Sequence, residues 1–113
     1  LQARDAVFVE STFTSPNYHF FALPNTTPPK PGLVRVTDSG ASIAVELWDV
    51  PLVHFGSFVG LIPSPLGIGS VELSDGRTVK GFICEPYALE GATDITHFGG
   101  WRAYIASKTA SII

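Results

Sequence analysis

The sequence predicts an α+β fold: a small mixed, mostly antiparallel β-barrel of about six strands with one or two helices. Two observations lead to this expectation. The chain holds 11 Gly and 9 Pro among 113 residues, which favours short strands and frequent turns over long helices. Its runs of β-branched and aromatic residues are short, and turn residues separate neighbouring runs as in hairpins. At this length a chain builds one core, so residues 1–113 are expected to form a single domain.

The first two strands are predicted at Ala6–Phe13 and Tyr18–Leu23, on either side of the turn residues Ser15-Pro16-Asn17. The first run alternates loosely, and the second is aromatic and too short for a helix. The segment Pro24–Gly32 follows, and its prolines lack the backbone donor that a strand ladder needs. We therefore expect an ordered surface loop there, close to polyproline II.

Two further hairpins are predicted. Leu33–Val36 and Ser42–Trp48 would form one, and Ser70–Leu73 and Thr78–Cys84 would form the other. The second hairpin contains Asp75-Gly76, a pair that suits a tight primed turn because Gly readily adopts positive φ.

Two helices are predicted between and after these strands. Apolar residues recur at helical spacing over Leu52–Leu61, with Pro51 suited to the first turn and Asp49 suited to the cap. A terminal helix is expected over Phe98–Lys108, with Thr96 as its cap.

A stretch of alternating proline and glycine precedes the last hairpin and is a candidate pocket wall. Two prolines stiffen it, and two glycines would let the backbone pass close to another strand or to a ligand. The residues concerned are Pro65, Leu66, Gly67, Ile68 and Gly69. The alternative is an ordinary entry loop.

Composition excludes several classes of function. The net charge is −3 and no basic stripe is present, so we expect neither a nucleic acid nor a membrane surface as partner. The single cysteine, Cys84, cannot form an internal disulfide, and in a strand it is expected to be a buried, inert thiol. No apolar run is long enough to span a membrane, and the expected location is the cytoplasm. Charged residues make up only 15%, which suggests that a second copy or a larger partner covers part of the surface.

General acid–base chemistry is the catalytic possibility that the residues leave open. The candidates are His19, Tyr18 and Glu85, and His19 and Tyr18 should face opposite sides of their strand. The three histidines are far apart in the sequence and form no local metal motif, so we expect no metal and no cofactor.

Charged groups near these candidates are predicted to hold an anion. Glu46 lies in an apolar strand and is expected to pair with Arg35, while Lys30 and Arg102 are the other available cations. The sequence Gly-Gly-Trp-Arg, whose last two residues are Trp101 and Arg102, would begin a helix whose free backbone amides favour anions. The alternative is that Trp101 and Arg102 simply pack at the start of this helix.

Four stretches, taken in order, resemble the C-terminal domain of allophanate hydrolase. They are Tyr18–Val36, Val45–Trp48, Phe55–Glu85 and Asp94–Ala106, and they span nearly the whole chain. The resemblance implies the gamma-glutamylcyclotransferase-like fold with a pocket. In the full enzyme a separate amidase-signature domain opens allophanate, so the resemblance implies that this chain alone is not an amidase.

The resemblance implies a role in urea and allophanate nitrogen metabolism. The first hypothesis is a stand-alone relative that binds a small carboxylate or carbamate compound and decarboxylates a molecule such as N-carboxycarbamate. The second is a non-catalytic module that forms a homo-oligomer, such as a homodimer, or docks onto an amidase-signature protein. A third is a piece of a larger fold whose open sheet edge would pair with another chain.

Overall fold

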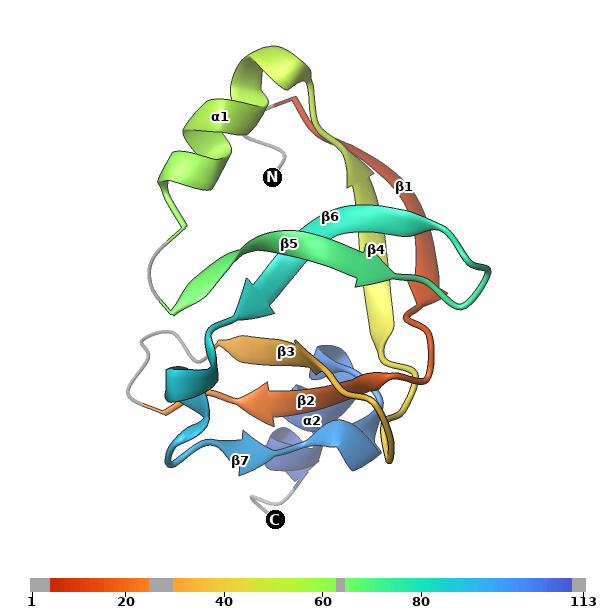
Figure 1. The fold of residues 1–113 in the computed structure, drawn as a ribbon, viewed down its shortest axis with the longest axis vertical. Helices are drawn as coiled ribbons and strands as arrows, with labels where there is room; N and C mark the ends of the chain where they lie inside the picture. Colours follow the sequence, from red (N-terminus) through yellow and green to blue (C-terminus); the bar gives the residue numbers. More distant parts are fainter. Residues whose placement is uncertain (1–4, 25–29, 63–64, 111–113) are drawn as a thin grey trace.

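The computed structural model describes residues 5–24, 30–62 and 65–110 of the chain. In these residues the strands and helices follow one another along the chain as Figure 1 shows. They are β1 (Val7–Phe13), β2 (Tyr18–Ala22), β3 (Pro31–Arg35), β4 (Ala44–Asp49), α1 (Leu52–Gly60), β5 (Leu66–Glu72), β6 (Thr78–Cys84), η2 (Pro86–Leu89), β7 (Thr93–Asp94), η3 (Thr96–Phe98) and α2 (Trp101–Ala110). The α+β class is therefore confirmed.

The predicted barrel is wrong, because the strands form three small antiparallel sheets that do not close on one another. Within the described residues, β1 pairs with β4, β5 pairs with β6, and β2 lies between β3 and β7. Figure 1 shows the β5–β6 hairpin between the β3–β2–β7 sheet and the end of the molecule that carries α1. Periodicity identifies strands, but the pairing of distant strands depends on tertiary contacts.

The predicted hairpin between Leu33–Val36 and Ser42–Trp48 is wrong for the same reason. β3 pairs with β2, and β4 crosses to pair with β1. The chain makes this change beside Gly40, where a Cβ would lie 2.7 Å from the Pro16 carbonyl oxygen. Only glycine allows the two segments to approach so closely.

The predicted loop Pro24–Gly32 is wrong at its end, because Pro31 and Gly32 belong to β3. Proline is tolerated as the first residue of a strand, and Pro31 holds that position opposite Ala22. Residues 25–29 lie outside the described part of the chain.

The β5–β6 hairpin is confirmed, with two corrections. The backbone N–H of Leu73 donates to the Arg77 carbonyl at 2.8 Å, and that of Gly76 donates to the Leu73 carbonyl at 3.1 Å. These bonds and the φ of 93° at Gly76 define a three-residue loop rather than a two-residue primed turn. The strand also begins at Leu66, so the predicted proline–glycine turn is largely part of β5.

Both predicted helices are present, but their caps differ from the prediction. Pro51 precedes α1 as the cap residue, and Asp49 ends β4 instead of capping the helix. The terminal helix begins at Trp101, because Gly99 has a φ of 75° and ends the short helix η3 before it. Thr96 lies in η3, where its hydroxyl accepts a hydrogen bond from the Phe20 N–H at 2.8 Å.

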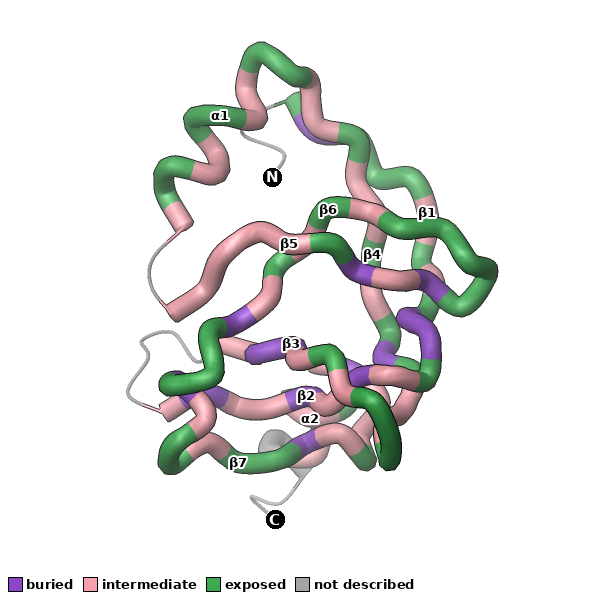
Figure 2. Tube along the Cα trace, viewed as in Figure 1, coloured by how far each residue is buried: buried purple, intermediate pink, exposed green. Residues whose placement is uncertain are grey.

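The core lies around β2 and β3, and α1 contributes no buried residue to it (Figure 2). The main cluster joins residues from β2, β3, β5, the segment just before β4 and the segment before η3. Its buried members are Tyr18, Phe20, Leu33, Ile43, Val71 and Ile95. A smaller cluster of Leu23, Cys84 and Ala88 packs at the end of β6.

Candidate functional site

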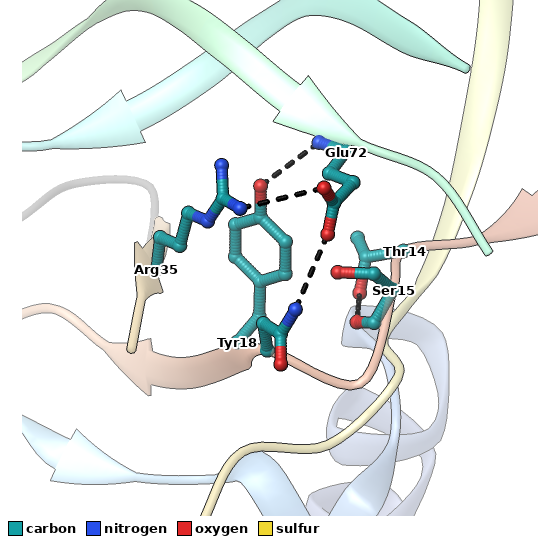
Figure 3. Close-up of polar contacts among 6 residues, drawn as sticks. Thr14, Ser15, Tyr18, Arg35 and Glu72 are labelled. Carbon is teal, nitrogen blue, oxygen red and sulfur yellow. Dashed lines mark hydrogen bonds and ion pairs between the residues drawn. The ribbon is translucent and has the colours of Figure 1, made fainter. Parts of the chain in front are cut away.

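Tyr18 and Glu72 join the β2–β3 sheet to the β5–β6 hairpin (Figure 3). The buried Tyr18 hydroxyl accepts a hydrogen bond from the Glu72 backbone N–H at 2.9 Å. The Ser15 N–H donates to the Glu72 carbonyl at 2.8 Å. The Glu72 carboxylate accepts a hydrogen bond from the Asn17 amide at 3.2 Å and pairs with the Arg35 guanidinium at 3.4 Å. Residues that the sequence separates widely therefore meet at one point.

These neighbours change the ionisation of Glu72. The Ser15 hydroxyl, the Asn17 amide and the Arg35 guanidinium lower the pKa of its carboxyl, in that order of effect. Among the described residues, the geometry gives the buried Ser15 Oγ no hydrogen-bond partner. Glu72 was not among the predicted site residues, although a charged residue that ends an apolar strand was a visible signal.

The structure does not gather the three predicted acid–base residues at one place. The half-buried His19 lies on the face of β2 opposite Tyr18, and its Nε2 is 2.8 Å from the Ser39 carbonyl oxygen. Glu85 is exposed at the far end of the hairpin, where its N–H donates to the Pro65 carbonyl. Tyr18 contacts the opposite end of the hairpin, where Glu72 pairs with Thr78, so the two groups lie at different ends of β6.

The predicted ion pair between Glu46 and Arg35 is wrong, since each residue pairs elsewhere. Glu46 accepts a hydrogen bond from Arg102 at 2.6 Å, while Arg35 pairs with Glu72. The two arginine side chains are 59% and 88% exposed, so water screens both pairs. Lys30 lies just before β3, and its carbonyl accepts the Leu23 N–H at 3.0 Å.

A cleft of about 630 Å³ lies between β4, α1 and the β5–β6 hairpin. Its walls are mainly aliphatic and aromatic side chains, with two charged residues, Glu46 and Lys80, among them. Of the predicted ligand-binding residues, Glu46, Ile68 and Trp101 line it. Sequence reasoning missed Lys80, even though a charge within the apolar run Thr78–Cys84 indicated a special position.

The other residues of the predicted pocket wall have structural contacts. A Cβ at Gly69 would lie 2.5 Å from Ile83 Cδ1, so the close approach predicted there is to a side chain of the paired strand. A Cβ at Gly67 would meet nothing within 4 Å. Leu66 packs against the smaller core cluster, and the Pro65 carbonyl accepts the Glu85 N–H.

Residues at the start of α2 are already engaged in contacts with other parts of the fold. Trp101 makes edge contacts with Phe20, at 6.3 Å between ring centroids, and lies 5.3 Å from the ring of Tyr104. The Gly99 carbonyl accepts the Ala44 N–H at 2.7 Å, which ties this helix start to β4. The Arg102 guanidinium already contacts a carboxylate, that of Glu46.

Cys84 is a free and buried thiol, and burial raises its pKa. Across residues 5–24, 30–62 and 65–110 no three His, Cys, Asp or Glu side chains are grouped as metal ligands. None of the helices in this part of the chain has the length and apolar character needed to cross a membrane.

The fold and the cleft define a small α+β domain with an open, apolar groove and with its charged groups mostly at the surface. The model of the allophanate hydrolase C-terminal domain matches residues 1–106. The chain therefore belongs to the allophanate hydrolase C-terminal domain family, as the resemblance predicted.

Known relatives agree with this assignment. The chain is 49% identical over 108 residues to the urea amidolyase of Saccharomyces cerevisiae. The match covers 92% of this chain and 6% of that protein. The solved urea amidolyase of Kluyveromyces lactis matches at 48% identity with a TM-score of 0.91, over 95% of this chain and 7% of the other. The solved structure of c4763, a uropathogenic E. coli-specific protein, matches at 32% identity with a TM-score of 0.85. The match covers 93% of this chain and 80% of c4763. The chain spans only a small part of the curated relatives it matches.

Proposed function

We propose that this chain acts in the breakdown of urea as a docking domain for the amidase part of an allophanate hydrolase. One observation carries the proposal: the outward stripe of α1 is uncharged. Leu52 and Val53 are 91% and 83% exposed there, with Gly56, Ser57, Gly60 and Leu61 completing the stripe. A surface helix normally places charged residues on this side, and exposed apolar patches of this kind mark protein contacts.

The occupant we propose for this stripe is the amidase part of the enzyme. A solved allophanate hydrolase of Kluyveromyces lactis is one of the relatives, and this chain covers 18% of it. The domain is thus accompanied there by much more polypeptide. Association of two copies through the same stripe is the alternative arrangement.

Sedimentation measurements test the docking proposal. The chain is mixed with the part of the Kluyveromyces lactis allophanate hydrolase that lies outside the match, and a 1:1 complex is expected. Val53→Glu should abolish the complex, because it places a charge in an apolar contact. Thr93→Glu, on exposed β7, is the matched control and should leave it intact. The absence of a complex at about 50 μM, or a homodimer instead, would overturn the proposal.

A second candidate function is the binding and decarboxylation of a small carbamate by a stand-alone chain, and the position of Lys80 on the cleft wall favours it. A cation there would hold one carboxylate of an N-carboxycarbamate-like compound. The bond between nitrogen and the departing carboxylate carbon would then break, carbon dioxide would leave, and an acid would protonate the nitrogen.

Calorimetry with malonate as a probe tests this candidate. Lys80→Ala, Arg35→Ala or Arg102→Ala should weaken malonate binding by more than about tenfold if that residue holds the anion. Unchanged affinity in all three variants, or no binding by the parent chain, would remove the small-anion function.

A further inference from the structure

The tip of the β5–β6 hairpin contains Asp75-Gly76, the only Asp-Gly pair in the sequence. The Asp75 side chain is 50% exposed. Gly76 has no side chain to shield its backbone nitrogen, and a Cβ at this position would meet nothing within 4 Å. The Asp75 carboxyl carbon and the Gly76 nitrogen are close along the chain, and ring closure between them is therefore not sterically hindered.

Ring closure at this pair would convert the aspartate into isoaspartate. The Gly76 nitrogen bonds to Asp75 Cγ and loses its proton, while the protonated carboxyl loses its hydroxyl, so that one water leaves. Water then attacks the main-chain carbonyl carbon of Asp75 and breaks its bond to the Gly76 nitrogen. The main chain afterwards runs through Cβ and Cγ and is longer by one carbon atom. No other reactant is consumed.

The fold restrains both reacting groups. Asp75 Oδ1 accepts the Arg77 backbone N–H at 3.0 Å, and Asp75 Oδ2 accepts the Nε–H of the Arg77 guanidinium at 2.8 Å. The Gly76 N–H donates to the Leu73 carbonyl at 3.1 Å. Before the ring can close, the carboxyl must release Arg77 and gain a proton, and the nitrogen must release Leu73.

The contacts with Arg77 also keep the Asp75 carboxyl ionised. The Arg77 backbone N–H has the largest effect and lowers the pKa of this carboxyl; burial opposes it, and the Arg77 guanidinium lowers the pKa further. No water can leave the carboxyl until one of its oxygens is protonated. The ionised, hydrogen-bonded form of Asp75 is therefore the unreactive one.

We propose that Asp75 is a site of isoaspartate formation, and that Arg77 slows the reaction by holding the Asp75 carboxylate in the folded chain. Arg77 also pairs with Glu10 of β1, and the Ser74 N–H donates to the Phe13 carbonyl at 2.9 Å. The extra carbon atom would disturb both contacts, so the modification would loosen the hairpin from β1. This inference does not depend on the docking role proposed above.

Incubation for several weeks at neutral pH in water labelled with heavy oxygen tests the inference, because hydrolysis of the ring places one solvent oxygen in the product. Digestion after glutamate releases residues 73–85, whose mass reports the label. A protease that cuts before aspartate but not before isoaspartate separates the two products. The peptide acetyl-Leu-Ser-Asp-Gly-Arg-Thr-Val-amide gives the rate without the fold. Asp75 of the native chain should take up label at least about tenfold more slowly than this peptide.

Two variants separate the effect of Arg77 from that of its other partner. Arg77→Ala should raise the rate at Asp75 by about two- to fivefold, the range expected for the loss of an exposed ion pair. Glu10→Gln is the matched control, because it leaves the contact between Arg77 and Asp75 in place and should not raise the rate. Asp38-Ser39, in the turn between β3 and β4, is the internal reference and should react equally in all three proteins.

Three outcomes would overturn the proposal. These are labelling of native Asp75 as fast as that of the peptide, equal rates in the parent and in Arg77→Ala, and an equal rise in Arg77→Ala and Glu10→Gln. Circular dichroism checks that each variant is folded. If Arg77→Ala is not, Arg77→Lys takes its place, because it keeps the positive charge but lacks the Nε donor, and it should also raise the rate.

Discussion

The hydrogen bond between Tyr18 and Glu72 should hold the β5–β6 hairpin, one wall of the cleft, on the β2–β3 sheet. In Tyr18→Phe the ring continues to fill the core, but the partly buried Glu72 N–H loses its acceptor. Leaving such a donor unsatisfied costs about 1–3 kcal/mol. With a urea m-value near 1.5 kcal/mol/M, a loss of about 2 kcal/mol lowers the unfolding midpoint by about 1.3 M. The corresponding fall in Tm is roughly 8–16 °C.

Urea unfolding followed by tryptophan fluorescence and circular dichroism measures this change. Tyr87→Phe is the control, because it removes the hydroxyl of an exposed tyrosine in η2 and should leave the midpoint unchanged. An unchanged midpoint in Tyr18→Phe would show that this hydrogen bond does not stabilise the fold. The Tyr18 hydroxyl would then be a candidate for the catalytic role predicted from the sequence.

Three further predictions follow from single sites. Because the fold lowers the pKa of Glu72, its ionised form is favoured in the native state, so stability should fall as pH drops below about 4.5 through the native pKa. Glu72→Gln should weaken that dependence in urea titrations between pH 3 and pH 7, and an identical slope in the parent and the variant would contradict it. Gly69→Ala should be less stable than Gly67→Ala, by up to about 1 kcal/mol, because a new Cβ would displace the end of the Ile83 side chain, whereas Gly67 has open space around it; equal thermal shifts would disprove this. Finally, Cys84 should react slowly with a disulfide reagent at pH 8 in the native state and rapidly in urea, since burial raises its pKa; fast native labelling would show that the thiol is accessible.

The candidate site was only partly predictable, because the relevant residues meet through tertiary contacts. Glu46, Ile68 and Trp101 were predicted and do line the cleft, each because of an unusual position within an apolar run or at a helix start. Lys80 and Glu72 were missed. Their roles depend on which edge of the hairpin faces the cleft and which faces Tyr18, and a single sequence carries no record of that orientation.

By itself, the sequence determined the local structure and the family. Alternation and turn residues located β1, β2 and the β5–β6 hairpin, and helical spacing located α1, because these signals act between residues close in the chain. The succession of four motifs was enough to indicate the allophanate hydrolase C-terminal domain. Only the tertiary structure decided that β3 pairs with β2, that β4 pairs with β1, and that the sheets remain open around an apolar cleft. The physical reason is that strand backbones carry the same donors and acceptors whatever their sequence, so partners are chosen by long-range packing.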